Sequence, residues 1–295
     1  MEQRKAFEIP EEDVSSAAPD ELFADYLERW LQIAKGTIAI TTYSSYEGML
    51  RYPLLPWFRE KGVTLKGLTA RHIQDFYSAQ MKRVKPNTVI HYHAVIHRAL
   101  KYAVKTDLID VNPADKVDRP RKNGFQPGFY DKDEMNRLFD CVGGLLIEAP
   151  VKLAAFYGLR RSEVLGLKWD AIDFDSGTIT IQHTVTGCNV DGRYTIVARD
   201  TTKTKSSRRT LPLTPAIREL LLVSGQSRRR TGGCAGILTS AATRATSASV
   251  RWACASARST LSCHFEQVLE RNGLRIRSHD QRHSSASLLL ANGAA

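Results

Sequence analysis

The sequence has few cysteines and no long apolar run. Its 295 residues contain five cysteines, at positions 141, 188, 234, 254 and 263, and none forms a Cys-x-x-Cys pair. This usage predicts reduced thiols, with neither a zinc site nor a disulfide framework. No stretch approaches the roughly 20 apolar residues of a membrane span, and the first residues lack the apolar run of a signal peptide. We therefore expect a cytoplasmic protein of two domains, each with its own core and with no membrane partner.

Charge is distributed unevenly along the chain, whose formal net charge is +11. Residues 1–28 hold two basic and nine acidic residues, net −7, and residues 1–19 are expected to form an acidic, flexible tail. Residues 29–120 hold fifteen basic and seven acidic residues, net +8. A basic domain behind an acidic tail favours a polyanionic partner.

Residues 224–263 differ in composition from the rest of the chain. Thirty-four of these forty residues are Ala, Gly, Ser, Thr, Arg or Cys, and none is Asp, Glu or Lys. Either a low-complexity linker or a locally shifted reading frame explains this anomalous segment. The shift is favoured, because compact domains seldom contain a structureless insert longer than roughly 15 residues.

Apolar spacing predicts four helices in a first domain over residues 20–110. Asp20 is expected to cap the first, and the second begins near Thr41 or Thr42 and ends before Pro53. Thr69 caps the third, and the fourth follows Lys85. Basic residues on the outer faces suit phosphate contacts, with solvated faces as the alternative. The candidates are Lys82, Arg83, Lys85, Arg98, Lys101 and Lys105, joined by Arg121 and Lys122 from the following linker.

Prolines and glycines mark residues 111–130 as a linker, so a second domain is expected over residues 131–295. Asp131 and Glu134 form a capping-box pattern, and a helix starting at Pro150 should end at Gly158. A small antiparallel sheet follows: strands begin at Thr178 and Arg209, and Asp191-Gly192 predicts a hairpin turn. Thr214-Pro215 reads as a capped helix start.

Histidines 91, 93 and 97 include an i, i+4 pair that a metal ion could use. Because no carboxylate or cysteine accompanies the pair in the sequence, a solvated or DNA-facing helix is predicted instead, and no metal site.

Three segments carry candidate chemistry. They read Gly158-Leu-Arg-Arg-Ser-Glu163, Thr202-Lys-Thr-Lys-Ser-Ser-Arg-Arg-Thr-Leu-Pro212 and His279-Asp-Gln-Arg-His283. Each segment alone is common by chance, but in this order, behind a basic helical module, they resemble the tyrosine recombinases, the phage integrase family. The resemblance covers residues 20–223 and 264–293. It implies a mainly α protein with a small antiparallel β-sheet: a four-helix SAM-like core-binding domain and an α+β catalytic domain.

By this resemblance, four side chains surround the scissile phosphate of DNA. Arg160 and Arg282 would clamp this phosphate, and His279 would donate a hydrogen bond to it. Lys203 would protonate the leaving 5′ oxygen. Lys205 is the alternative to Lys203, since a hairpin can shift register. Glu163 would orient the arginine, which the family motif places three residues earlier and so at Arg160 rather than Arg161; Asp280 and His283 would support the site.

The resemblance implies no cofactor. It implies that the partner is double-stranded DNA at attachment sites and that full-length members form tetramers on that DNA. Members cut DNA through a 3′-phosphotyrosyl intermediate, formed by a tyrosine well after the His-x-x-Arg box, whereas the last tyrosine here is Tyr194. We therefore expect a C-terminally truncated, inactive catalytic domain. The alternatives are a non-catalytic DNA-binding protein that occupies attachment sites and an enzyme like a type IB topoisomerase.

Overall fold

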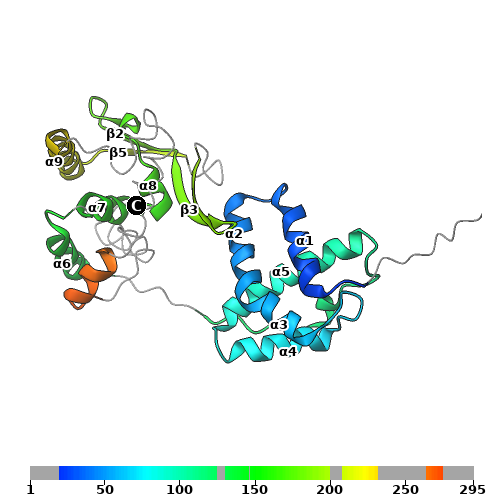
Figure 1. The fold of residues 1–295 in the computed structure, drawn as a ribbon. Coiled ribbons are helices and arrows are strands. Elements are labelled where there is room, and N and C mark those ends of the chain that lie inside the picture. Colours follow the sequence, from blue (N-terminus) through cyan, green and yellow to red (C-terminus); the bar gives the residue numbers. More distant parts are fainter. Residues whose placement is uncertain (1–19, 125–129, 146, 200–207, 232–263, 275–295) are drawn as a thin grey trace, which may run out of the picture. The chain divides into compact units, whose positions relative to one another are not determined.

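The computed structural model describes residues 20–124, 130–145, 147–199, 208–231 and 264–274, and the side chains of all these except 224–231. The chain divides into two compact units, Met1–Asn123 and Gly124–Ala295 (Figure 1). None of the helices in these ranges is long and apolar enough to cross a membrane.

Helices make up the first unit (Figure 1). They are α1 (Phe23–Lys35), α2 (Ile40–Met49), α3 (Leu55–Lys61), α4 (Ala70–Met81) and α5 (Pro86–Lys105). Aromatic side chains from α1, α3 and α4 fill its core, where Phe58 lies edge-on to Phe23 at 4.8 Å between ring centroids and 5.5 Å from Phe76. All three rings are fully buried.

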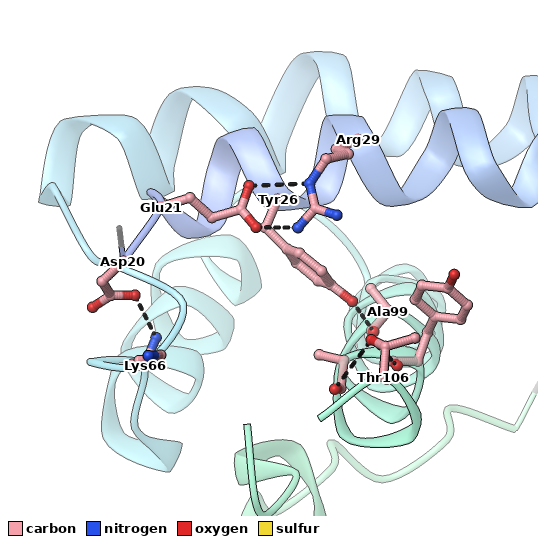
Figure 2. A network of polar contacts seen from close by, with 9 residues as sticks. Asp20, Glu21, Tyr26, Arg29, Lys66, Ala99 and Thr106 are labelled. Atoms are coloured by element: carbon pink, nitrogen blue, oxygen red, sulfur yellow. Dashed lines mark hydrogen bonds and ion pairs between the residues drawn. The ribbon is translucent and has the colours of Figure 1, made fainter. Parts of the chain in front are cut away.

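The start of α1 is fixed by distant backbone rather than by the predicted Asp20 cap, and this expectation was wrong. Leu22 occupies the cap position, and no side chain accepts a cap hydrogen bond there. Asp20 instead accepts a hydrogen bond from the backbone N–H of Lys66 at 3.1 Å (Figure 2). Hydrogen bonds from Thr64 and from Lys66 lower the pKa of this carboxyl group. The entry to α1 is therefore tied to the loop after α3.

A buried tyrosine joins α1 to α5. The Tyr26 hydroxyl donates to the carbonyl oxygen of Ala99 at 2.6 Å, and its side chain is fully buried (Figure 2). On the solvent side of the same helix, Arg29 forms an ion pair with Glu21.

The prediction that helical structure ends before Pro53 was wrong. After α2 the chain forms a π-helical turn over Leu50–Leu54, with Pro53 inside it, and continues directly into α3. A widened turn accommodates the proline ring, which would otherwise clash with the preceding turn. Leu50 and Leu54 are 1% and 0% exposed, so burial of this turn compensates for its irregular backbone. As a result, α3 adds a helical segment to the predicted four.

Local capping signals were read correctly for α4 and α5. Thr69 accepts a hydrogen bond from the backbone N–H of His72, and Pro86 opens α5 after Lys85. Within the range predicted as linker, Pro113–Lys116 form a 3-10 helix that lies against α4 and α5, with Ala114 1% exposed.

The second unit combines helices with two small antiparallel sheets (Figure 1). Its helices are α6 (Lys132–Val142), α7 (Glu148–Tyr157), α8 (Arg161–Gly166) and α9 (Pro215–Thr231), with a 3-10 turn at Trp169–Ala171. Its strands are β1 (Ile172–Asp173), β2 (Thr178–Ile181), β3 (Thr184–Val190), β4 (Arg193–Arg199) and β5 (Arg209–Pro212). The mainly α fold class with small antiparallel sheets is confirmed.

The strands form two sheets where one was predicted. Strands β1, β2 and β5 pair in that order, with Ile179 opposite both Ile172 and Leu211. Strands β3 and β4 form a separate hairpin around the predicted turn, where Asp191 and Gly192 have φ angles of 50° and 74°. Both positive φ values match a type I′ turn.

One helix boundary and one helix cap in this unit differ from the predictions. The predicted Asp131–Glu134 capping box is present, but α7 begins at Glu148, two residues before Pro150. Pro215 opens α9 as predicted, whereas the Thr214 hydroxyl oxygen is buried without a hydrogen-bond partner among the described residues, so it does not cap that helix.

Residues 264–271 are helical, and the segment contributes to the core of the second unit. Phe265, Leu269 and Leu274 pack in one apolar cluster with residues of α6 and α7, including Met135 and Leu138. Residues 264–274 are thus part of the folded domain, whereas the anomalous segment 224–263 lies mostly outside the described residues.

Candidate functional site

Arg160 stands at a sharp junction between two helices of the second unit. Helix α7 ends at Tyr157, and Gly158 follows in the left-handed region with φ 58° and ψ 35°. Glycine adopts this conformation without the steric cost of a side chain. Leu159 then anchors the turn at 3% exposure, and Arg160 occupies the cap position of α8. The turn therefore fixes the backbone of Arg160 while its side chain is 49% exposed.

The carboxylate of Glu163 is buried, and both of its oxygens accept hydrogen bonds. Its side chain is 1% exposed, and Oε1 accepts a hydrogen bond from Nη1 of Arg160 at 2.9 Å. Oε2 accepts from the backbone N–H of Arg160 at 3.0 Å and from Nη2 of Arg209 at 3.0 Å. Burial by itself raises the pKa of Glu163, but the hydrogen bonds from Arg209 and Arg160 outweigh it and hold that pKa below its usual value. A charged carboxylate therefore orients Arg160.

Arg209 is a member of this cluster that sequence reasoning missed. It opens β5, which pairs with β2 so that Arg209 lies opposite Ile181. Its side chain is 27% exposed and reaches Glu163 across 46 residues of sequence. The sequence predicted the contact of Glu163 with Arg160, three residues away. It did not predict the contact with Arg209, because that contact depends on how β5 lies relative to α8.

The other residues predicted around the phosphate lie outside the described residues. These are Lys203, Lys205, His279, Asp280, Arg282 and His283. The connection between β4 and β5 contains Lys203 and Lys205, and Arg161 is an exposed residue in the first turn of α8.

The three tyrosines of the second unit pack or form hydrogen bonds within the fold. Tyr130 is 5% exposed in the core. The Tyr157 hydroxyl donates to the carbonyl oxygen of Pro212 at 2.8 Å and accepts from the backbone N–H of Thr214 at 3.3 Å. Tyr194 lies across the hairpin: its hydroxyl oxygen would be 1.9 Å from a Cβ built on Gly187. Glycine at 187 thus makes room for the ring.

The eight cations predicted to contact DNA from the first unit are all exposed. They fall into two groups along α5, whose 20 residues span roughly 30 Å. One group lies at the N-terminal end of α5, because the backbone N–H of Asn123 donates to Asn87 at 3.2 Å and so holds the end of the linker there. It comprises Lys82, Arg83, Lys85, Arg121 and Lys122. The other, Arg98, Lys101 and Lys105, follows the C-terminal half of α5.

The histidine pair on α5 differs from its prediction. His93 is 8% exposed, and its Nδ1 forms a hydrogen bond of 2.8 Å with the Tyr77 hydroxyl. A carboxylate does accompany the pair, since Asp115 from the 3-10 helix lies 2.7 Å from Nε2 of His97. No group of three potential metal ligands occurs among the described residues.

Two family models match the chain. The model described as "Phage integrase family" matches residues 129–295, and the one described as "Phage integrase, N-terminal SAM-like domain" matches residues 22–81.

Curated relatives match over part of their length. The prophage integrase IntR of Escherichia coli strain K12 is 25% identical over 146 residues, 48% of this chain and 33% of its own. The tyrosine recombinase XerC of Pediococcus pentosaceus is 34% identical over 87 residues, which cover 28% of this chain and 29% of the relative. A XerC-like tyrosine recombinase of Caldanaerobacter subterraneus is 23% identical over 68% of this chain and 54% of its own. The chain thus spans between 29% and 54% of these relatives.

Solved structures share the fold. The Tn1549 transposon integrase in complex with circular intermediate DNA matches with a TM-score of 0.68 and 15% identity, over 93% of this chain and 89% of that one. A lambda integrase tetramer bound to a Holliday junction matches with a TM-score of 0.64 and 17% identity, over 90% and 72%. The predicted combination of a SAM-like domain and an integrase catalytic domain is thereby confirmed as the fold.

Proposed function

Because the chain belongs to the phage integrase family, we propose that it acts on double-stranded DNA in site-specific recombination. The observation that carries this proposal is the Arg160 guanidinium, which is half exposed yet fixed by the buried carboxylate of Glu163. Arginine binds phosphate oxygens through a planar fork and stays charged at any working pH. Such a preorganised cation suits the negative charge that develops on a phosphate during strand cleavage.

The remaining roles follow from the three sequence segments. Arg282 would complete the clamp, His279 would donate a hydrogen bond to the phosphate, and Lys203, or Lys205 in its place, would protonate the leaving 5′ oxygen. Asp280 and His283 would support them. The solved structures of Tn1549 and lambda integrases are complexes with DNA, and one is a tetramer, which supports DNA as substrate and assembly on it.

The first unit would hold the duplex. Its exposed cations gather at the N-terminal end of α5 and along its C-terminal half. Contacts of this kind fix the position of a protein on the phosphate backbone, and they make its affinity depend on salt.

DNA binding provides the first test. Sites would be selected from random duplexes with the 295-residue chain, and affinity for a selected site would be measured by fluorescence anisotropy from 50 to 200 mM salt. We expect a selected site to bind at least about 10³-fold tighter than random duplex. Arg160→Gln should lower the slope of log affinity against log salt by about one, whereas Arg161→Gln should not. Equal binding to all duplexes, or a slope unchanged by Arg160→Gln, would contradict the proposal.

A second candidate function, DNA binding without cleavage, is favoured by the tyrosines of the second unit. The sequence has no tyrosine between residues 195 and 295. The Tyr157 hydroxyl is hydrogen-bonded within the fold, and the ring of Tyr194, which is 37% exposed, lies against Gly187. We propose that none of the tyrosines at 130, 157 and 194 is a nucleophile, so that strand cleavage by the second unit needs a nucleophile supplied from outside that unit.

Covalent trapping separates the two candidates. A nicked duplex carrying the selected site is incubated with the 295-residue chain and analysed on a denaturing gel. We expect no protein–DNA adduct. An adduct that is lost when Tyr130→Phe, Tyr157→Phe and Tyr194→Phe are combined would refute this assignment. An adduct that survives the three changes would place the nucleophile elsewhere in the chain and refute binding without cleavage, and relaxation of supercoiled plasmid would support a type IB topoisomerase-like activity instead.

A further inference from the structure

Arg160 is oriented by a carboxylate that is shared with a second arginine from a different element. Glu163 uses Oε1 for Arg160 and Oε2 for Arg209, with side-chain distances of 2.9 and 3.0 Å. The side chain of Arg160 is 49% exposed, that of Arg209 is 27% exposed, and that of Glu163 is 1% exposed. We propose that Arg209 is a positioning residue for the phosphate contact of Arg160, acting through Glu163. This inference rests on the proposed function of Arg160.

Charge balance explains why one arginine is not enough. A buried carboxylate loses its hydration, and this cost is repaid only by close cations and well-formed hydrogen bonds. Arg160 is half exposed, so solvent and a bound phosphate both compete with Glu163 for its guanidinium. Arg209 is better shielded, and it supplies the largest favourable contribution to the lowered pKa of Glu163.

Geometry explains what Arg209 adds beyond charge. Arg160 and Glu163 lie three residues apart, so their pair belongs to a single helix turn and has no anchor in another element of its own. Arg209 holds the carboxylate from outside, because β5 is fixed by its register with β2, where Arg209 lies opposite Ile181. With Oε2 held by Arg209 and by the backbone N–H of Arg160, Oε1 is presented to the Arg160 guanidinium.

The neighbouring Arg208 offers a matched control. It precedes β5, is exposed, and carries the same charge one residue away. Arg208 lies just before the strand, outside the β5–β2 pairing in which Arg209 takes part.

A double-mutant cycle on DNA affinity tests the inference with the full 295-residue chain and the selected site. Arg209→Gln should weaken binding about fivefold to tenfold in the wild-type background and less than twofold in the Arg160→Gln background, since coupled residues are not additive. Arg208→Gln should change affinity by the same factor in both backgrounds. Arg209→Lys should restore part of the loss, because lysine keeps the charge but not the fork. Equal losses from Arg209→Gln in both backgrounds would overturn the inference.

A measurement without DNA distinguishes failure of this inference from failure of the proposed function. In chain labelled with ¹⁵N-arginine, the Arg160 guanidinium signal, identified by its loss in Arg160→Gln, should show restricted rotation. Arg209→Gln and Glu163→Gln should both release it, and Arg208→Gln should not. Circular dichroism checks that each variant is folded, and Arg209→Met, which also removes the charge and the fork, replaces Arg209→Gln if that variant does not fold. Unchanged restriction in a folded variant at position 209 refutes positioning, whereas normal release with no effect of Arg160→Gln on DNA affinity refutes only the proposed function.

Discussion

Acidification from pH 7 to pH 4 is expected to destabilise the first unit through His93. This histidine lies in α5 with 8% of its surface exposed, and its Nδ1 is hydrogen-bonded to the Tyr77 hydroxyl of α4 at 2.8 Å. The other charged or titratable groups that act on it are His97, Arg119 and Asp115. Burial, then His97 and Arg119, lower the pKa of His93 from 6.5 to about 4, and Asp115 opposes them weakly.

The sign of the effect follows from proton binding. Between pH 6.5 and pH 4 the unfolded chain binds a proton at His93 and the folded chain does not, so stability falls as pH falls through this window. Each unit of pKa difference corresponds to about 1.4 kcal/mol, so the loss reaches at most about 3 kcal/mol. Against a typical stability of roughly 5–15 kcal/mol, this is a large share for one side chain.

Urea unfolding at several pH values measures this loss. Trp30 and Trp57 report on the first unit once the tryptophans at 169 and 252 are replaced by phenylalanine. His93→Asn keeps a hydrogen-bonding atom near Nδ1 but cannot take up a proton, so its free energy of unfolding should fall less than that of the parent chain by about 2 to 3 kcal/mol between pH 6.5 and pH 4.

His91→Asn is the matched control, because it removes an exposed histidine from the same helix. If the parent chain and His93→Asn lose stability in parallel over this range, while both remain folded at pH 7, the reasoning is refuted.

Three further substitutions probe packing. Gly166→Ala should destabilise the second unit by about 1 to 3 kcal/mol in thermal or urea unfolding, because its Cβ would lie 2.6 Å from the backbone oxygen of His183. Gly48→Ala, in a helix with nothing within 4 Å of the added Cβ, should stabilise the first unit by about 0.5 to 1 kcal/mol; a loss there would contradict the open space seen around it. Tyr26→Phe should cost about 1 to 3 kcal/mol, since the carbonyl oxygen of Ala99 loses its donor; an unchanged unfolding midpoint would show that this bond adds no net stability.

Features set by local chemistry could be predicted from the sequence. The helix cap at Thr69, the capping box at Asp131 and the Asp191-Gly192 turn each depend on residues within a few positions of one another. The left-handed glycine at 158 belongs to the same class, because a glycine that follows an apolar helical pattern predicts where the helix ends.

Features set by tertiary contacts could not be predicted. Asp20 bonds to backbone 46 residues away, and Pro53 is tolerated because burial of its neighbours compensates for the π-helical turn. Arg209 reaches Glu163 over the same span of 46 residues. The local sequence around each of these residues does not reveal the contacts or the burial that determine its structure, because these arise only when the chain folds.

The charge of the first unit overstates how much of its surface can hold DNA. Arginines on its α1 and α3 side are paired with acids: Arg59 contacts both Asp25 and Glu28, and Arg29 pairs with Glu21. None of the cations at the N-terminal end of α5 forms an ion pair with a residue that the structure describes. Since a cation that is already paired releases no counterions when it meets a phosphate, the salt dependence of binding should be carried by the α5 cations rather than by the α1 and α3 arginines.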